Sequence, residues 1–118
     1  HASDMRRIFP RWTEPYWSEN LPLLKQAQAM AGDLGMTTSQ LAIAWTLARE
    51  PGCVPIPGTT SRKHLADNFK AAELALTPDQ VTALDSVFQP EAVKGPRYSP
   101  AAQASVDTEQ YAFEAAEG

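Results

Sequence analysis

The stretch CVPIPGTTSRKHLADN, residues 53–68, decides the fold that the sequence predicts. Residues 53–57 are apolar on both faces and lie between Gly52 and Gly58, which is typical of a short parallel strand in a two-sided core. A single strand cannot satisfy its own backbone donors and acceptors, and no second convincing strand is present. The sequence therefore predicts an incomplete α/β unit, mostly helical when isolated, whose sheet is completed by other segments.

Helical patterns lie on both sides of this strand. Apolar residues at steps of three and four, together with capping signals, predict helices at residues 18–34, 38–50, from about 61 onward, and 78–88. Thr37 with Gln40, and Thr77 with Gln80, have the spacing of a capping box. The second helix is apolar on nearly every side and is expected to be buried on most faces, with Trp45 in the core.

The composition excludes several classes of protein. The chain has 118 residues, 43% of them hydrophobic, and a net charge of −4, which predicts one small globular domain without general affinity for nucleic acid or anionic membranes. No run approaches the ~20 apolar residues of a membrane helix. Cys53 is the single cysteine, so we expect a small buried side chain and a reducing, cytoplasmic location. The first residue is His1 rather than Met, which favours a partial chain.

Hydrogen-bond donors and positive charge gather where the third helix begins. A helix N-terminus binds anions readily, Thr59, Thr60 and Ser61 add hydroxyl groups, and Arg62 adds a planar fork suited to phosphate. Gly58 lets the backbone approach a ligand closely. The alternative interpretation is a turn, an ordinary cap and a solvated basic face. Asp and Glu residues show no metal-ligand spacing, so no metal is expected.

The sequence closely resembles the C-terminal part of the aldo-keto reductases, in the bacterial and plant branch with the PIPGTT motif. The resemblance rests on DMRRIFPRW (4–12), SENL (18–21), TTSQLAIAWTLA (37–48), VPIPGTTSRKHLADN (54–68), LTPDQVTALD (76–85) and GPRY (95–98). It implies that residues 1–118 are a C-terminal fragment of a (β/α)8 TIM barrel. Residues 1–17 would be a loop, 18–100 the last two to three β/α units with extra helices, and 101–118 a tail. The partner would be the remaining N-terminal part of the barrel.

The resemblance also implies a site for NADP(H). Gly58 and Thr59 would contact the adenosine 2′-phosphate, and the full set of cofactor-binding residues would be Gly58, Thr59, Thr60, Ser61, Arg62, Asp67 and Asn68, the last two at the adenine edge. Many relatives have Lys-Ser where this chain has Gly-Thr, and Arg where it has His64. The preference for NADPH over NADH therefore stays open.

The resemblance implies that the whole enzyme reduces aldehydes and ketones to alcohols with an Asp, a Tyr, a Lys and a His on earlier strands. No such set converges here, so no catalytic residue is predicted and the chain alone is not expected to catalyse. Two alternatives stay open. The chain could be a non-catalytic helical module that self-associates into a homo-oligomer, or a regulatory, nucleotide-sensing subunit of the same fold.

Residues in the first loop have further predicted roles. Trp12 and Trp17 flank a segment that, by resemblance, lies near the substrate mouth, so they could line the carbonyl pocket. Arg6, Arg7 and Arg11 are expected to pair with acidic groups on the barrel surface.

Overall fold

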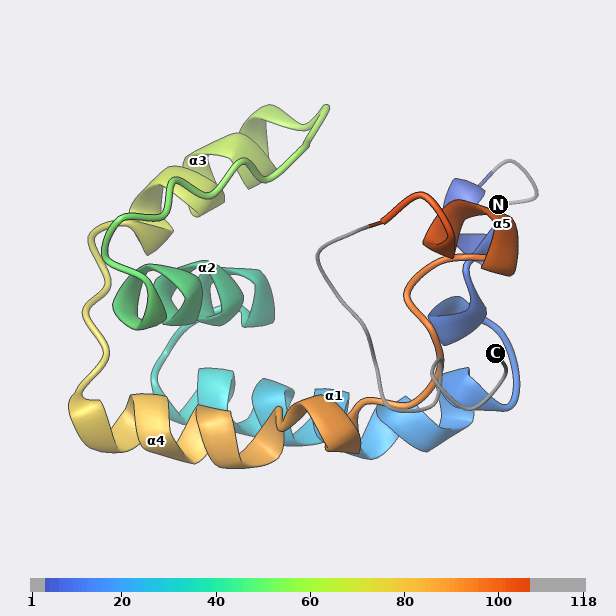
Figure 1. Ribbon diagram of the computed structural model, residues 1–118. Helices are drawn as coiled ribbons and strands as arrows, with labels where there is room; N and C mark the ends of the chain where they lie inside the picture. The colour runs from blue at the N-terminus through green and yellow to red at the C-terminus, as the bar shows by residue number, and fades with distance from the viewer. Residues whose placement is uncertain (1–3, 107–118) are drawn as a thin grey trace. The chain divides into compact units, whose positions relative to one another are not determined.

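The computed structural model describes residues 4–106, and every regular element in that range is helical (Figure 1). Three are short 3-10 helices: η1 (Met5–Ile8), η2 (Pro10–Trp12) and η3 (Pro90–Ala92). Five are α-helices: α1 (Tyr16–Asp33), α2 (Thr38–Arg49), α3 (Arg62–Ala71), α4 (Pro78–Val87) and α5 (Pro100–Gln103). The prediction of a mostly helical isolated chain is confirmed.

The chain divides into two compact units. Within the described residues, one contains residues 4–20 and 94–106, and the other contains residues 21–93. Helix α1 begins in the first unit, and most of its length belongs to the second. Of the predicted tail at 101–118, residues 107–118 lie outside the described residues.

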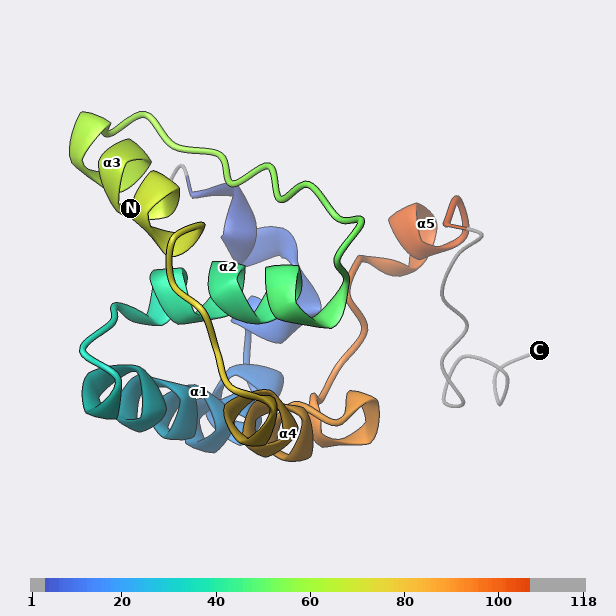
Figure 2. The ribbon, with the colours of Figure 1, turned by 90° about the vertical axis from the view of Figure 1, so that its left-hand side faces the viewer.

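The core of the second unit lies where α1, α2 and α4 meet. Ala31, Leu41 and Leu84 are each only 2% exposed and form one cluster. The small Ala31 side chain allows α1 to approach the two leucines closely, and burial of each leucine contributes roughly 1.5–3 kcal/mol. Figures 1 and 2 both show α1 and α4 side by side. Partly buried hydrophobic residues surround the cluster: Met30, Leu34, Met36, Trp45, Leu76 and Phe88.

Both predicted capping boxes are present. At the start of α2, the Thr37 N–H donates to Gln40 Oε1 (3.0 Å) and the Gln40 N–H donates to Thr37 Oγ1 (3.2 Å). At the start of α4, the equivalent distances for Thr77 and Gln80 are 2.8 and 3.3 Å. The two helices therefore begin where the sequence places them, with their first N–H groups satisfied.

The predicted strand at residues 53–57 is not formed. Residues 53–59 have no regular secondary structure, and in the part of the chain that the structure describes no backbone hydrogen bond joins 54–60 to another segment. A strand forms by pairing, and residues 4–106 provide no second strand. Val54 and Ile56, predicted to be buried, are 81% and 92% exposed.

Two other burial predictions are corrected for the same reason. In α2 only Leu41 and Ala44 are buried, so the helix is less enclosed than its apolar sequence predicts. Cys53 is half-buried rather than buried. Trp45 does pack against the core, as predicted. An apolar surface stays exposed when the elements that would cover it are not among the described residues.

The first unit contains short helices where the sequence predicts an ordered but irregular loop at residues 1–17. Asp4 caps η1 by accepting from the Arg6 N–H (3.0 Å), and α1 begins at Tyr16 rather than at Ser18. Arg11 Nε donates to the Gly95 carbonyl oxygen (2.9 Å). Arg6 pairs with Asp4, as expected for a surface arginine. This unit is therefore held by contacts between its two sequence-distant parts.

Candidate functional site

The predicted cofactor residues 58–62 lead into α3, and all of them except the half-buried Ser61 are exposed. Thr59 Oγ1 accepts from the Ser61 N–H (3.1 Å), and Ser61, the N-cap of α3, accepts from the His64 N–H (3.3 Å). The Thr59 O–H also donates to the Ser61 carbonyl oxygen in a long contact (3.5 Å), whereas the Ser61 O–H can donate to a ligand. Thr59, Thr60 and Arg62 are exposed.

Gly58 has a conformation that other residues could adopt. Its φ is not positive, unlike the φ angles of Gly35 and Gly95. No atom lies within 4 Å of the position that a Cβ on Gly58 would occupy. The space beside this backbone is therefore open, as a group approaching residues 58–60 would require.

The charge at the start of α3 is positive. Arg62, Lys63 and His64 occupy its first turn, which contains no acidic residue. Cations at a helix N-terminus oppose the helix dipole, so this arrangement costs stability unless an anion is bound there. The arrangement suits a phosphate group and disfavours a cationic ligand.

The two predicted adenine-edge residues lie farther along the same helix. Asp67 and Asn68 are half-buried and sit between one and two turns beyond Arg62. The Asp67 carbonyl oxygen accepts from Gln40 Nε2 (3.2 Å), which ties this part of α3 to the start of α2. The sequence predicts the residues but not this connection.

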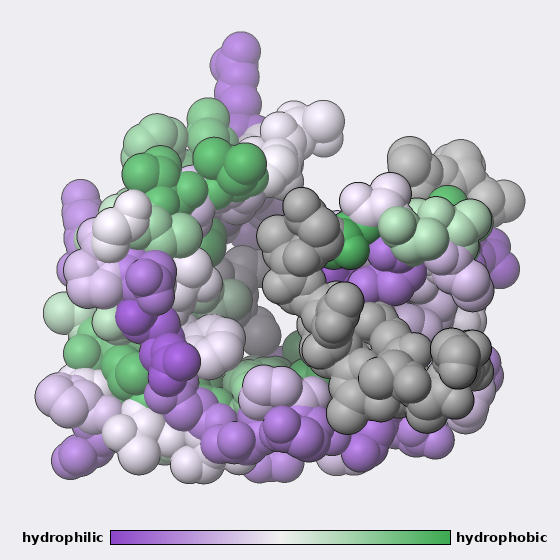
Figure 3. All heavy atoms as spheres, viewed as in Figure 1, coloured by the Kyte–Doolittle hydropathy of each residue, from purple (hydrophilic) through white to green (hydrophobic). Residues whose placement is uncertain are grey.

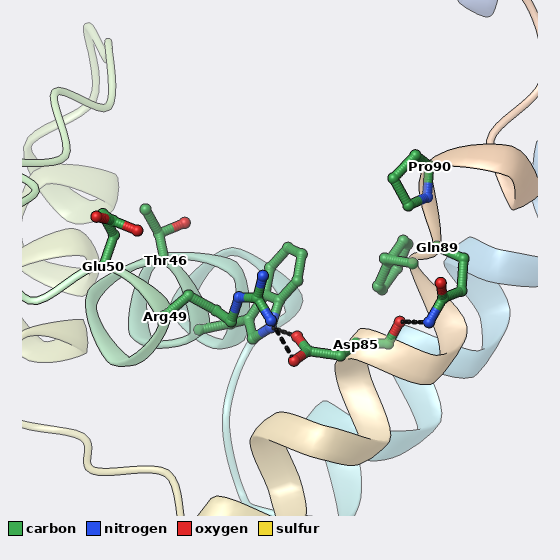
Figure 4. Close-up of a pocket in the computed structure, with 8 residues that line it drawn as sticks. Thr46, Arg49, Glu50, Asp85, Gln89 and Pro90 are labelled. Carbon is green, nitrogen blue, oxygen red and sulfur yellow. Dashed lines mark hydrogen bonds and ion pairs between the residues drawn. The ribbon is translucent and has the colours of Figure 1, made fainter. Parts of the chain in front are cut away.

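A pocket that the sequence does not predict lies between α2 and α4 (Figure 4). It has a volume of about 400 Å³ and is lined by Trp45, Thr46, Arg49, Glu50, Asp85, Phe88, Gln89 and Pro90. Figure 4 shows Arg49 and Asp85 pointing toward one another. Trp45 and Arg49 lie four residues apart and therefore on the same face of α2. This spacing is the signal in the sequence that could have indicated that both side chains contact one partner.

Asp85 organises this pocket. Trp45 Nε1 donates to Asp85 Oδ1 (2.8 Å), and Arg49 Nη1 donates to Asp85 Oδ2. The Trp45 and Phe88 rings lie 5.9 Å apart, centroid to centroid. The ionisable side chains in the lining are Arg49, Glu50 and Asp85, and the lining contains no Tyr, Lys, His or Cys.

In the first unit, Trp12 and Trp17 stack with their ring centroids 5.7 Å apart and their planes 18° from parallel. The Arg6 guanidinium lies 5.1 Å from the Trp12 ring centroid. Hydrogen bonds from the Arg6 side chain and N–H hold the pKa of the Asp4 carboxyl well below its usual range, and Asp4 raises the pKa of Arg6. Trp12 is 48% exposed.

Comparison with known proteins identifies the family. The sequence profile described as "Aldo/keto reductase family" matches residues 1–89. This chain belongs to the aldo/keto reductase family. It is 33% identical over 103 residues to the aldo-keto reductase yakc of Schizosaccharomyces pombe, whose name includes NADP(+). It is 30% identical over 95 residues to the aldo-keto reductase str7 of Strobilurus tenacellus. No solved structure matches the chain.

The aldo/keto reductase relatives are much longer than this chain. The matches cover 87% and 80% of the chain, but 30% and 28% of yakc and str7. The family fold is a TIM barrel, whereas residues 4–106 form helices without strands. The match supports an oxidoreductase piece and a nicotinamide cofactor in the family.

The described residues were also compared with the requirements of a membrane span and of a metal site. Within residues 4–106, no helix is both long and apolar enough to cross a membrane. In the same residues, no group of three or more His, Cys, Asp or Glu side chains is placed to hold a metal ion.

Proposed function

We propose that this chain forms the adenosine 2′-phosphate half of an NADP(H) site in an aldo/keto reductase and carries no catalytic residue of its own. The observation that supports the proposal is the start of α3. Hydroxyl groups and cations gather there, no acid is present in the first turn, and residues 58–60 are exposed. The name of yakc, which includes NADP(+), agrees with this ligand.

Each residue of the stretch has a role in this proposal. The backbone N–H groups at Gly58 and Thr59 and the Thr59, Thr60 and Ser61 hydroxyl groups donate to the 2′-phosphate, and the Arg62 guanidinium pairs with its charge. Asp67 and Asn68 recognise the adenine edge. When bound, the nicotinamide of NADP(H) supplies the hydride in the reaction. The residues of this chain bind and orient the other end of the cofactor.

The substrate of the whole protein is proposed to be an aldehyde or ketone, which it reduces reversibly to an alcohol. In that protein this chain is the C-terminal part of the barrel and acts by fixing the position of the cofactor. Precise placement of a bound reactant lowers the entropic part of the barrier, so a non-catalytic segment can control the rate. A cytoplasmic location stays a prediction.

The partner of this chain is proposed to be the N-terminal part of the same barrel. Val54 and Ile56 in the extended segment, and Leu65 and Phe69 one turn apart on α3, are 81%, 92%, 48% and 71% exposed. Figure 3 shows hydrophobic surface over α3 and the segment that precedes it. Residues 54–60 also leave their backbone groups unpaired within the described structure. Parallel strands of a barrel would cover both the apolar side chains and the backbone.

Self-association is a second candidate, because the same segment favours it. An exposed, apolar, unpaired segment is a template on which another copy can add a strand. Sedimentation velocity over a range of concentrations separates the two candidates. A monomer supports the barrel partner, and a dimer that dissociates on Ile56→Lys supports self-association.

Isothermal titration of this chain tests the phosphate site directly. The probe is adenosine 2′,5′-bisphosphate, and the comparison ligand is adenosine 5′-monophosphate, which lacks the 2′-phosphate. We expect weak binding, with a preference for the bisphosphate that Arg62→Ala removes and Lys63→Ala retains. The Lys63 variant is a matched control because it removes the same charge from the same helical turn. Equal binding of the two ligands by the unmodified chain would contradict the proposal.

A further inference from the structure

The side chain of Gln40 bonds to two separate elements. Its Oε1 accepts from the Thr37 N–H (3.0 Å), which closes the capping box of α2. Its Nε2 donates to the Asp67 carbonyl oxygen of α3 (3.2 Å) in a partly buried contact that joins residues 27 apart in sequence. One carboxamide therefore fixes the start of α2 and the middle of α3 together.

A comparison with Gln80 separates the bond that belongs to the cap from the bond that joins two helices. It occupies the same capping-box position at the start of α4 and its Oε1 accepts from the Thr77 N–H (2.8 Å). Within residues 4–106, the hydrogen bonds of Gln80 stay within its own cap. The capping box thus uses only the Oε1 atom of the glutamine side chain. The Nε2 atom of Gln40 has an additional role, because it donates to Asp67.

Helix α3 has few other attachments near the proposed nucleotide site. Residues 62–66 are all exposed, and the segment that leads into α3 is unpaired within the described structure. The fully buried residue of α3 is Ala71, at its C-terminal end, and α3 as a whole packs against α2. The bond from Gln40 to Asp67 lies between this buried end and the exposed start, so it restricts rotation of α3 about Ala71.

We propose that Gln40 is a positioning residue for the adenine end of the nucleotide site. This inference rests on the proposed function, because Asp67 and Asn68 are the residues assigned there to adenine. By holding the backbone at Asp67, Gln40 fixes the direction in which the neighbouring Asn68 side chain is presented. It has no contact with the ligand in this proposal and acts through α3.

Gln40→Glu tests the role in the full chain. Glu keeps an oxygen that accepts from the Thr37 N–H, but it loses the donor and places a carboxylate against the Asp67 carbonyl oxygen. Gln80→Glu makes the same chemical change in the α4 cap and is the matched control. The probe is adenosine 2′,5′-bisphosphate, measured by isothermal titration. We expect Gln40→Glu to weaken binding roughly three- to tenfold, and Gln80→Glu to change it less than about twofold. Equal weakening by both variants would overturn the inference.

A second ligand distinguishes positioning from general loss of structure. The inosine analogue of the bisphosphate has the same phosphates but a different base edge. We expect Gln40→Glu to reduce the preference of the chain for adenine over hypoxanthine. Equal weakening for the two ligands, with the preference retained, would show that Gln40 stabilises the fold without positioning the adenine contacts.

Amide hydrogen exchange keeps the test independent of ligand binding. If the unmodified chain binds neither nucleotide, the proposed function fails. Amide exchange still tests whether the bond from Gln40 to Asp67 holds α3 in place. We expect Gln40→Glu to increase exchange at residues 67–71, and Gln80→Glu to leave it unchanged. Unchanged exchange in Gln40→Glu would overturn the positioning role even where the nucleotide binds.

Discussion

The carboxamide of Asn20 forms a reciprocal pair of hydrogen bonds with the backbone of Lys94. Asn20 Nδ2 donates to the Lys94 carbonyl oxygen (2.9 Å), and the Lys94 N–H donates to Asn20 Oδ1 (2.8 Å). The side chain thus pairs with the backbone much as a neighbouring strand would. It holds the GPRY segment against the beginning of α1 within the first unit. This contact explains why two sequence-distant parts form one compact unit.

Gly95, next to this contact, is expected to be intolerant of a side chain. It has φ +85°, and a Cβ there would lie 2.5 Å from Tyr16 Cγ. Gly95→Ala should therefore destabilise the first unit by roughly 2–4 kcal/mol, from backbone strain and from displacement of the Tyr16 ring. Amide exchange at residues 16–20, measured under native conditions, reports this loss.

Gly35→Ala is the control for backbone strain alone. Gly35 has φ +66°, but nothing lies within 4 Å of its potential Cβ. We expect a loss of about 1 kcal/mol, seen as faster exchange near the start of α2. A Gly95→Ala effect no larger than this would show that the approach of Tyr16 to Gly95 is not tight.

Asp85 should stabilise the second unit mainly through Trp45. Asp85→Ala leaves the partly buried Trp45 Nε1–H without its acceptor, which should cost roughly 1–3 kcal/mol in urea unfolding. Asp85→Asn keeps an oxygen acceptor and should cost less. Arg49→Ala removes a surface ion pair and should cost at most about 1 kcal/mol. A larger loss for Arg49→Ala than for Asp85→Ala would reverse this assignment.

The Asp4 and Arg6 pair should be visible in a pH titration. Because hydrogen bonds from Arg6 lower the pKa of Asp4, its contribution is present above the ordinary Asp pKa of about 3.9 and is lost as the pH falls through the lowered value. The contribution to stability is small because the pair is at the surface. Carboxyl NMR of Arg6→Ala should show the Asp4 pKa rising toward its ordinary value, while Arg7→Ala leaves it depressed. A similar rise in both variants would rule out a specific pair.

Val54 and Ile56 should contribute little to the stability of the isolated chain. Ile56 is 92% exposed, so Ile56→Ser should change the free energy of unfolding by less than about 0.5 kcal/mol. It should also lower the fluorescence of bound anilinonaphthalene sulfonate, which reports exposed apolar surface. Leu84→Ala, in the core, should cost roughly 2–5 kcal/mol. A comparable loss for Ile56→Ser would mean that residues 54–57 are packed in solution.

Features that depend on neighbouring residues could be predicted from the sequence. The capping boxes of Thr37 with Gln40 and of Thr77 with Gln80 involve groups three residues apart, so local sequence specifies them. The start of α3 after Ser61 is local in the same way. These signals placed the starts of α2, α3 and α4, whereas α1 was predicted from its apolar periodicity and begins two residues earlier than predicted.

Features that depend on distant partners could not be predicted. The apolar run at 53–57 has the composition of a strand, but pairing requires other strands, and without them Val54 and Ile56 stay exposed. The bond from Trp45 to Asp85 joins residues 40 apart, and that from Asn20 to Lys94 joins residues 74 apart. The spacing of Trp45 and Arg49 indicates that they can share a partner, but no local pattern identifies that partner as Asp85 or pairs Asn20 with Lys94. The residues proposed to bind the cofactor were predicted by resemblance, and their role stays a prediction.

The most direct test compares two cofactors in the longer protein of which this chain is proposed to be the C-terminal part. The dissociation constants for NADPH and NADH are measured before and after Arg62→Ala, by quenching of tryptophan fluorescence. The proposed phosphate contact predicts that NADPH binding weakens roughly ten- to hundredfold while NADH binding changes little. Equal weakening for both cofactors, or no change for NADPH, would contradict the placement of the 2′-phosphate at the start of α3.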